Sequence, residues 1–101
     1  MNEFNLADYV VNELGGNELL TKYGAKEFYI SEDVFEFRVP LAHTNGNVHT
    51  IQFTKDWNET NIINVASIDK RGENICSMLV DTSVPNTPTY IKDIIDSMLC
   101  K

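Results

Sequence analysis

Two histidines are the side chains in this chain that best suit acid–base chemistry near neutral pH. His43 and His49 stand on either side of an expected turn at Thr44-Asn45-Gly46, so both should lie near one hairpin. A zinc site would need further Cys or carboxylate ligands, and the sequence places no acid clearly beside the pair. We therefore expect ordinary sheet residues here, with no metal and no cofactor. A small enzyme that uses His43 or His49 as a base is kept as the second alternative.

The other candidate nucleophiles and acids lack the sequence context that catalysis requires. No serine lies in a nucleophile-elbow motif, and no glycine-rich loop could bind a phosphate group. Cys76 and Cys100 form no CxxC motif, and we expect two reduced thiols. Adjacent carboxylates such as Glu32-Asp33 fit a solvated turn. The sequence thus predicts no catalytic residues and a non-enzymatic protein.

Trp57 is the residue whose type best suits a binding surface, because tryptophan is enriched at the strongest contacts of protein interfaces. In an up-and-down sheet, the turn at Glu32-Asp33 and the loop from Asp56 to Thr60 lie at the same end. That end would gather four acidic side chains around the tryptophan. We predict a partner-binding surface that consists of Glu32, Asp33, Asp56, Trp57 and Glu59. The alternative is that Trp57 folds back onto the core.

The charge of the chain restricts the class of partner. The 101 residues have a net charge of −7. Residues 1–36 contain eight acidic and two basic side chains, which gives −6, whereas residues 37–101 contain seven acidic and six basic side chains, which gives −1. Surfaces that bind nucleic acid cluster Lys and Arg, so we expect no direct nucleic-acid partner. A basic protein is the partner that this charge favours.

Neither end of the sequence predicts a membrane-bound or exported protein. No apolar run approaches the roughly 20 residues that a membrane-spanning helix needs. The N-terminus lacks the basic segment and the small-residue cleavage site of a signal peptide. We therefore expect a cytoplasmic protein without a membrane partner, and one domain over residues 1–101.

Apolar residues at helical spacing predict helices at both ends of the chain. Asn5 can cap a first helix that Gly15-Gly16 ends, and its apolar stripe consists of Ala7, Val10, Val11 and Leu14. A short second helix from Asn17 to Gly24 would complete an N-terminal helical hairpin. Thr87-Pro88 is typical of a helix start, with a hydroxyl cap and a proline at the first position. The stripe that follows it consists of Ile91, Ile94, Ile95 and Met98.

Between the helices the apolar period changes to two, which predicts five antiparallel strands near residues 26–30, 35–41, 49–54, 61–68 and 74–80. A two-residue turn at Glu32-Asp33 would pair Ile30 with Phe35 and Phe28 with Phe37. A three-residue loop ending at Gly46 would pair Phe37 with Phe53 and Val39 with Ile51. Pro40 should lie where a ladder ends, at a bulge or with its donor side toward solvent. The predicted fold class is α+β, an antiparallel meander sheet of about five strands with an N-terminal helical hairpin and a C-terminal helix.

Strands four and five are apolar on both faces, so both faces should be covered, either by a helix or by a second copy of the chain. The leading functional hypothesis is a small acidic protein-binding module that docks on a basic, nucleic-acid-handling protein. Such a module could be a phage or mobile-element inhibitor of the anti-CRISPR or anti-restriction type, since the eleven asparagines suggest AT-rich coding. The alternative is a homodimeric adaptor or secretion-chaperone-like protein that pairs through strands four and five.

Overall fold

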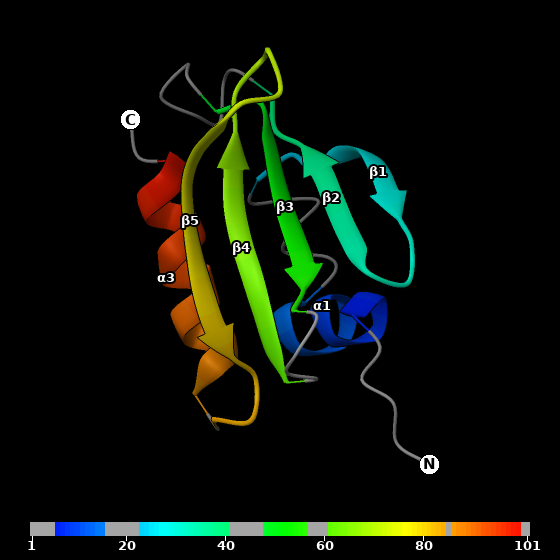
Figure 1. The fold of residues 1–101 in the computed structure, drawn as a ribbon, viewed down its shortest axis with the longest axis vertical. Helices are drawn as coiled ribbons and strands as arrows, with labels where there is room; N and C mark the ends of the chain where they lie inside the picture. The colour runs from blue at the N-terminus through cyan, green and yellow to red at the C-terminus, as the bar shows by residue number, and fades with distance from the viewer. Residues whose placement is uncertain (1–5, 16–22, 41–47, 57–60, 85, 100–101) are drawn as a thin grey trace.

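A single five-stranded antiparallel sheet with two helices forms the described part of the chain (Figure 1). The computed structural model describes residues 6–15, 23–40, 48–56, 61–84 and 86–99. The elements, in chain order, are α1 (Leu6–Leu14), β1 (Lys26–Ile30), β2 (Val34–Arg38), β3 (Thr50–Lys55), β4 (Ile62–Ile68), β5 (Asn74–Asp81) and α3 (Thr87–Leu99). The strand order β1-β2-β3-β4-β5 confirms the predicted α+β meander. The predicted cap at Asn5 and the second helix of the predicted hairpin, from Asn17, lie outside the described residues.

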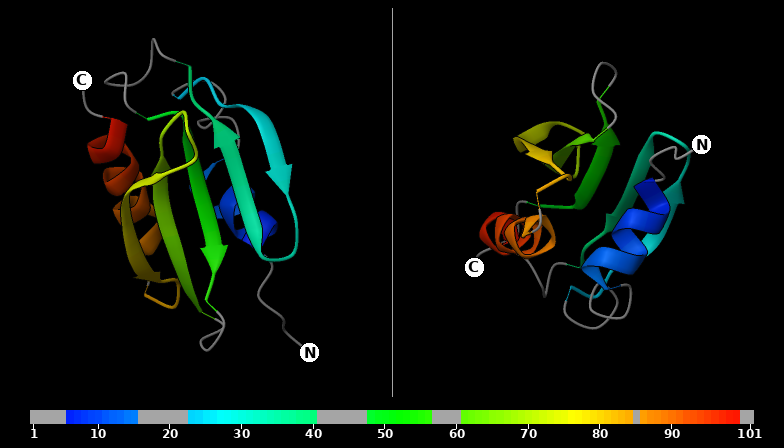
Figure 2. Two further views of the ribbon diagram at one scale, coloured as in Figure 1. Left: turned by 45° about the horizontal axis from the view of Figure 1, so that its top comes forward. Right: turned by 90° about the horizontal axis from the view of Figure 1, so that it is seen from below.

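Both described helices lie against the same face of the sheet (Figure 2). That face carries every second residue of the central strands, and its fully buried side chains are Phe35, Phe37, Ile51, Phe53, Ile63 and Val65. They form one hydrophobic core with the inward residues of the two helices, which are Leu6, Val10, Ile91, Ile94, Ile95 and Leu99. The alternation in the sequence therefore predicts the buried face of the sheet correctly. Neither helix combines the length and the hydropathy that crossing a bilayer would require.

The apolar stripe predicted for α1 is wrong in one respect. Val11 is 47% exposed, whereas Leu6, which the prediction left out, is buried with Val10 one helical turn away. The helix is rotated so that these two larger side chains enter the core and Ala7 is only half-buried. Gly15 ends the helix at a φ of 83°, a left-handed conformation that suits glycine, as predicted. The side chain of Leu14 is not among those described.

Helix α3 begins at Thr87, as predicted, but the hydroxyl of that residue does not cap the helix in the expected way. Thr87 Oγ1 lies 2.6 Å from the Val84 carbonyl oxygen and 2.7 Å from that of Asp81. The hydroxyl thus acts as a donor toward the preceding loop and ties the start of α3 to the end of β5. The first helical hydrogen bond runs from Tyr90 N–H to the Asn86 carbonyl oxygen.

The hairpin of β1 and β2 has the predicted two-residue turn. Ser31 N–H donates to the Val34 carbonyl oxygen at 2.8 Å, and Ile30 pairs with Phe35. The register then shifts at Glu27, whose φ of 53° marks a bulge. Phe28 keeps its predicted face, because its ring centroid lies 6.0 Å from that of Phe37.

The predicted register between β2 and β3 is wrong by two residues. Phe37 pairs with Ile51, not with Phe53, and Val39 N–H donates to the His49 carbonyl oxygen at 2.9 Å. Burial alternates with a period of two, so it fixes a register only to a multiple of two. Because Val39 N–H faces β3, the nitrogen of Pro40 faces away from β3, and its missing N–H removes no hydrogen bond to that strand. Pro40 lies beyond the end of β2, which is one of the three positions predicted for it. Gly46 lies outside the described residues, so its left-handed turn stays a prediction.

Candidate functional site

The predicted acidic surface is only partly within the described chain. Glu32 and Asp33 are exposed at the tip of the first hairpin, and Asp56 is half-buried at the end of β3. Lys55 N–H donates to the Asp33 carbonyl oxygen at 2.9 Å, so the two acidic segments lie at the same end of the sheet, as predicted. Lys55 adds a positive charge to that end. Trp57 and Glu59, which were predicted as the anchor and rim of this surface, lie outside the described residues.

Asp81 is an acidic residue of this end that the sequence reasoning missed. It pairs with Ile62, whose carbonyl oxygen accepts a hydrogen bond from Asp56 N–H at 3.0 Å, so β5 ends beside Asp56. Ser83 donates to the Asp81 carboxylate through its hydroxyl at 2.6 Å and its backbone N–H at 2.9 Å. These two hydrogen bonds lower the pKa of Asp81 below its usual range. The meander order alone could have placed this residue, because β5 runs in the same direction as β3 and must end at the same end of the sheet.

Of the two histidines, His49 lies within the part of the chain that the structure describes. His49 is half-buried, and its Nδ1 lies 3.0 Å from Thr50 Oγ1. His43 lies outside the described residues. Among the residues that the structure describes, no group of three or more His, Cys, Asp or Glu side chains could bind a metal ion.

Strand β5 exposes apolar side chains along most of its length. All of residues 74–79 are exposed, including Ile75 at 47% and Leu79 at 67%. Cys76 is a free, exposed thiol within the same strand. Both described helices lie on the face of the sheet opposite to Leu79. A helix was one of the two covers predicted for the outer face, and neither described helix covers that face. We call Ile75, Cys76, Met78, Leu79 of β5 and Tyr90 of α3 the β5 surface.

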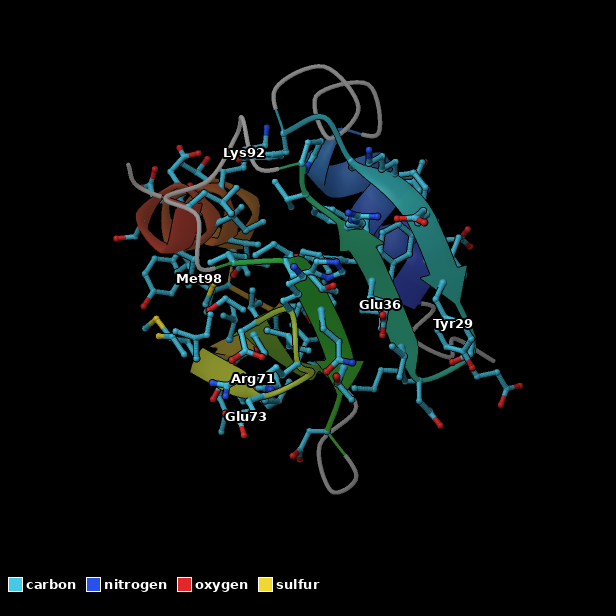
Figure 3. The ribbon with its side chains drawn as sticks, turned by 90° about the horizontal axis from the view of Figure 1, so that it is seen from above. Tyr29, Glu36, Arg71, Glu73, Lys92 and Met98 are labelled. Atoms are coloured by element: carbon cyan, nitrogen blue, oxygen red, sulfur yellow. The ribbon has the colours of Figure 1, made fainter. Side chains whose placement is uncertain are left out.

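A groove of about 510 Å³ separates α3 from β5 on the helical face. Helix α3 directs Ile91 and Ile95 into the core, which leaves the neighbouring flank of the helix beside the inward residues of β5. The groove is lined mainly by apolar side chains, among them Ile75, Met78, Tyr90, Ile94 and Met98. Figure 3 shows Met98 on the side of α3 that faces β5 and Lys92 on the opposite side of the helix. Asp93 supplies the charged group among the described lining residues.

The backbone of β5 is also open along its outer edge. Thr82 N–H donates to the Asn61 carbonyl oxygen at 2.7 Å, which fixes these two residues as a hydrogen-bonded pair. The register continues without a shift to the pair Ser67 and Cys76, so in β5 the even-numbered residues bond to β4. The N–H and C=O groups of Ser77 and Leu79 therefore point away from β4. No described strand lies beyond them.

Comparison with known proteins assigns no role to these surfaces. The chain matches no family model, no curated protein and no solved structure. Its function is therefore inferred from the geometry of the β5 surface and of the acidic end of the sheet, which consists of Glu32, Asp33, Asp56 and Asp81.

Proposed function

We propose that this chain is a non-enzymatic protein-binding domain that binds another polypeptide through the β5 surface. The observation that carries the proposal is an uncovered eight-residue edge strand beside an apolar groove. Contiguous exposed apolar surface of this kind is typical of interaction sites, since exposing it to water has a cost and folding does not require it. Side chains scattered singly over a surface would not support the same proposal.

The expected binding energy comes from the side chains that the partner would cover. Burying an exposed Leu or Met side chain completely contributes about 1.5–3 kcal/mol. Leu79 and Met78 lie on opposite faces of β5, so a partner must reach both faces of the strand or its edge to gain both contributions. Much of this gain is offset by the lost freedom of the two chains, so moderate affinity is expected.

A displayed library of random peptides tests the proposal and does not require a named partner. Peptides enriched on the wild-type chain should bind at least about tenfold more weakly to Ile75→Glu and Leu79→Glu, because a buried carboxylate opposes apolar contact. Val11→Glu is the matched control, since Val11 on α1 has the same 47% exposure as Ile75. Circular dichroism should show the same fold for all three variants. Enriched peptides that bind the β5 variants as well as they bind the control would refute the proposal.

A second candidate is the docking of the acidic end on a basic, nucleic-acid-handling protein, in the manner of an inhibitor. It is supported by the four acidic residues that lie at one end of the described sheet, which are Glu32, Asp33, Asp56 and Asp81, and by the net charge of −7. Reversal of Glu32 and Asp33 to Lys should slow association with a basic partner and weaken its salt dependence. The two turn-tip changes should each alter stability by less than about 0.5 kcal/mol. Association that ignores both salt and charge reversal would exclude this candidate.

A further inference from the structure

The proposed function leaves open how a partner would sit on the β5 surface and what chemistry it would need. We propose that the partner binds as a sixth strand along β5, and that this strand has apolar side chains at alternate positions and one Lys or Arg directed at Asp93. The inference rests on the proposed function and specifies both its binding mode and its partner class.

The open backbone of β5 supports addition of a strand. Ser77 and Leu79 direct their N–H and C=O groups outward, at the spacing with which an extended chain forms a ladder. The regular part of β5, from Cys76 to Asp81, is about 20 Å long at about 3.4 Å per residue, enough to pair with a segment of similar length. The segment from Asn74 to Val80 contains no charged side chain, and charge is a common means of blocking an edge.

The groove between α3 and β5 supports the requirement for alternate apolar side chains. A sixth strand would lie about 4.8 Å beyond β5, and every second side chain would point to the helical face. On that face these side chains would enter the groove and contact Met78 of β5 and Tyr90 and Met98 of α3. The remaining side chains would lie beside Leu79 on the other face. Both faces of the β5 surface would be covered by one segment.

Asp93 supports the requirement for a basic residue. Its carboxylate is exposed in an otherwise mostly apolar groove, and no described residue that lines the groove is basic. Lys92 lies on the other side of α3 (Figure 3). A Lys or Arg side chain can lay its apolar stem along Tyr90 and Met98 and place its charge at the carboxylate. An acidic side chain at the same position would be repelled.

The same charge argues against a second copy of the chain as the occupant. Pairing two β5 strands about a two-fold axis would place the two α3 helices side by side in opposite directions. Asp93 is the central residue of α3 and shares the groove with Met78 near the centre of β5. The two Asp93 carboxylates would therefore approach one another near the axis, between chains that each have a charge of −7. Charge complementarity favours a cationic segment.

Synthetic nine-residue peptides test the inference directly. The set has Val or Ile at alternate positions, Thr between them, and Lys, Gln or Glu at the central position, which belongs to the apolar set. Fluorescence anisotropy should show the Lys peptide binding at least about tenfold more tightly than the Glu peptide. Asp93→Asn should reduce this preference to less than about threefold, whereas Glu32→Gln, which removes one exposed charge at the other edge of the sheet, should preserve it.

Two further measurements locate the peptide and identify its binding mode. Methylation of every second peptide nitrogen on the edge that faces β5 should abolish binding, because the ladder cannot form. In a Cys100→Ser background Cys76 is the sole cysteine, and the bound Lys peptide should slow its alkylation, since the thiol lines the groove.

Each contrary outcome identifies what is wrong. Equal binding of the Lys, Gln and Glu peptides, or failure of all three to bind, would overturn the inference. Binding that survives nitrogen methylation but is lost in Leu79→Glu would overturn strand addition and leave the proposed function intact. Sedimentation that shows a dimer, lost in Leu79→Glu, would replace the cationic segment with a second copy. The proposed function itself fails only if selected peptides bind regardless of Ile75→Glu and Leu79→Glu.

Discussion

The two edges of the sheet, β1 and β5, both expose apolar side chains but differ in how accessible their backbones are. β1 has five residues, begins with Lys26, and bends at the left-handed residue Glu27. The Glu27 carboxylate forms a 2.8 Å ion pair with Arg38 at this bend. β5 has eight residues and is regular from Cys76 to Asp81. An edge that is bent and charged near its start is poorly suited to pair with another strand, whereas the regular run of β5, uncharged from Cys76 to Val80, is better suited.

Exposed side chains alone would not have distinguished these edges. Tyr29 and Ile30 of β1 are as exposed as the apolar residues of β5. Phe28 of β1, however, contacts the rings of the core residues Phe35 and Phe37, at centroid distances of 5.9 Å and 6.0 Å, while it stays 40% exposed. In β5 the inward residue Met78 meets a groove in place of a filled core. The difference supports β5, rather than β1, as the edge proposed to bind a partner.

The largest expected effect would come from weakening the core contact that holds α3, which forms one side of the groove, against the sheet. Ile95 is fully buried where α3 meets the sheet, so Ile95→Ala should lower the free energy of unfolding by about 2–5 kcal/mol. Ile75→Ala, an exposed change on β5, should cost far less. Urea denaturation of both variants measures the contrast. Equal midpoints for the two would show that α3 does not depend on this contact.

A pair of proline substitutions tests whether β5 is open at its outer edge. Met78→Pro removes an N–H that bonds to Val65 and should cost about 3 kcal/mol. Leu79→Pro removes an N–H that points away from β4, so it should cost at least about 1 kcal/mol less, and it should also abolish strand addition. Thermal unfolding gives the ranking. The reverse order would contradict the hydrogen-bond pattern assigned to β5.

The turn that leads into β5 gives a smaller effect. Gly72 has a φ of 88°, and a Cβ added there would meet nothing within 4 Å, so the cost of a side chain is backbone strain alone. Gly72→Val should destabilise the fold by about 1–2 kcal/mol, and Gly72→Asn should cost less because asparagine tolerates this conformation. Chemical denaturation of the two variants tests the difference. Equal stability of wild type and Gly72→Val would contradict the left-handed turn.

The smallest expected effect is a pH dependence at the two ends of β5. Asp69 accepts hydrogen bonds from Glu73 N–H and Arg71 N–H, both at 2.9 Å, and that from Glu73 contributes most to lowering the pKa of Asp69. The pKa of Asp81 is lowered by Ser83. A carboxylate with a lowered pKa in the folded state stabilises above the unfolded value, about 3.9, and this contribution disappears as pH falls through the folded value. Thermal midpoints measured below pH 4 should therefore fall less steeply in Asp69→Asn than in wild type.

Most of the fold was predictable from local pattern. The period of two predicts five strands and their order, and the two-residue turn correctly pairs Ile30 with Phe35. The stripe at Ile91, Ile94 and Ile95 predicts the buried face of α3. These features depend on residues close in sequence, whose spacing is dictated by helix and strand geometry.

The predictions that were wrong concern features for which the local sequence pattern fits two arrangements equally well, and tertiary contacts decide between them. The pairings Phe37 with Phe53 and Phe37 with Ile51 both bury the same face, so the burial pattern does not distinguish them, and the structure has the second. The rotation of α1 depends on whether Leu6 or Val11 meets the core, which the helical pattern alone leaves open. The sequence pattern predicts which face of a helix or strand is buried better than it predicts the register between neighbouring strands.

The candidate site was predictable in part for the same reason. The common end of Glu32, Asp33 and Asp56 follows from the order of the strands. The groove does not, because it depends on α3 leaving the inward side of β5 uncovered. The sequence did show that β5 is apolar on both faces. It could not show that Tyr90 and Asp93 of α3 would lie beside it.

The open edge of β5 also has a consequence for how the protein behaves at high concentration. An unpaired, uncharged edge strand is a template for cross-β aggregation. With a net charge of −7, copies of the chain repel one another at neutral pH, so the overall charge opposes pairing at an edge whose segment from Asn74 to Val80 carries no charge. Acidification to near the isoelectric point of about 4.6 brings the net charge to zero and so removes this repulsion, while the strand is unchanged. We expect light scattering to rise sharply on mild acidification, and an edge-blocking Leu79→Pro variant to stay clear under the same conditions.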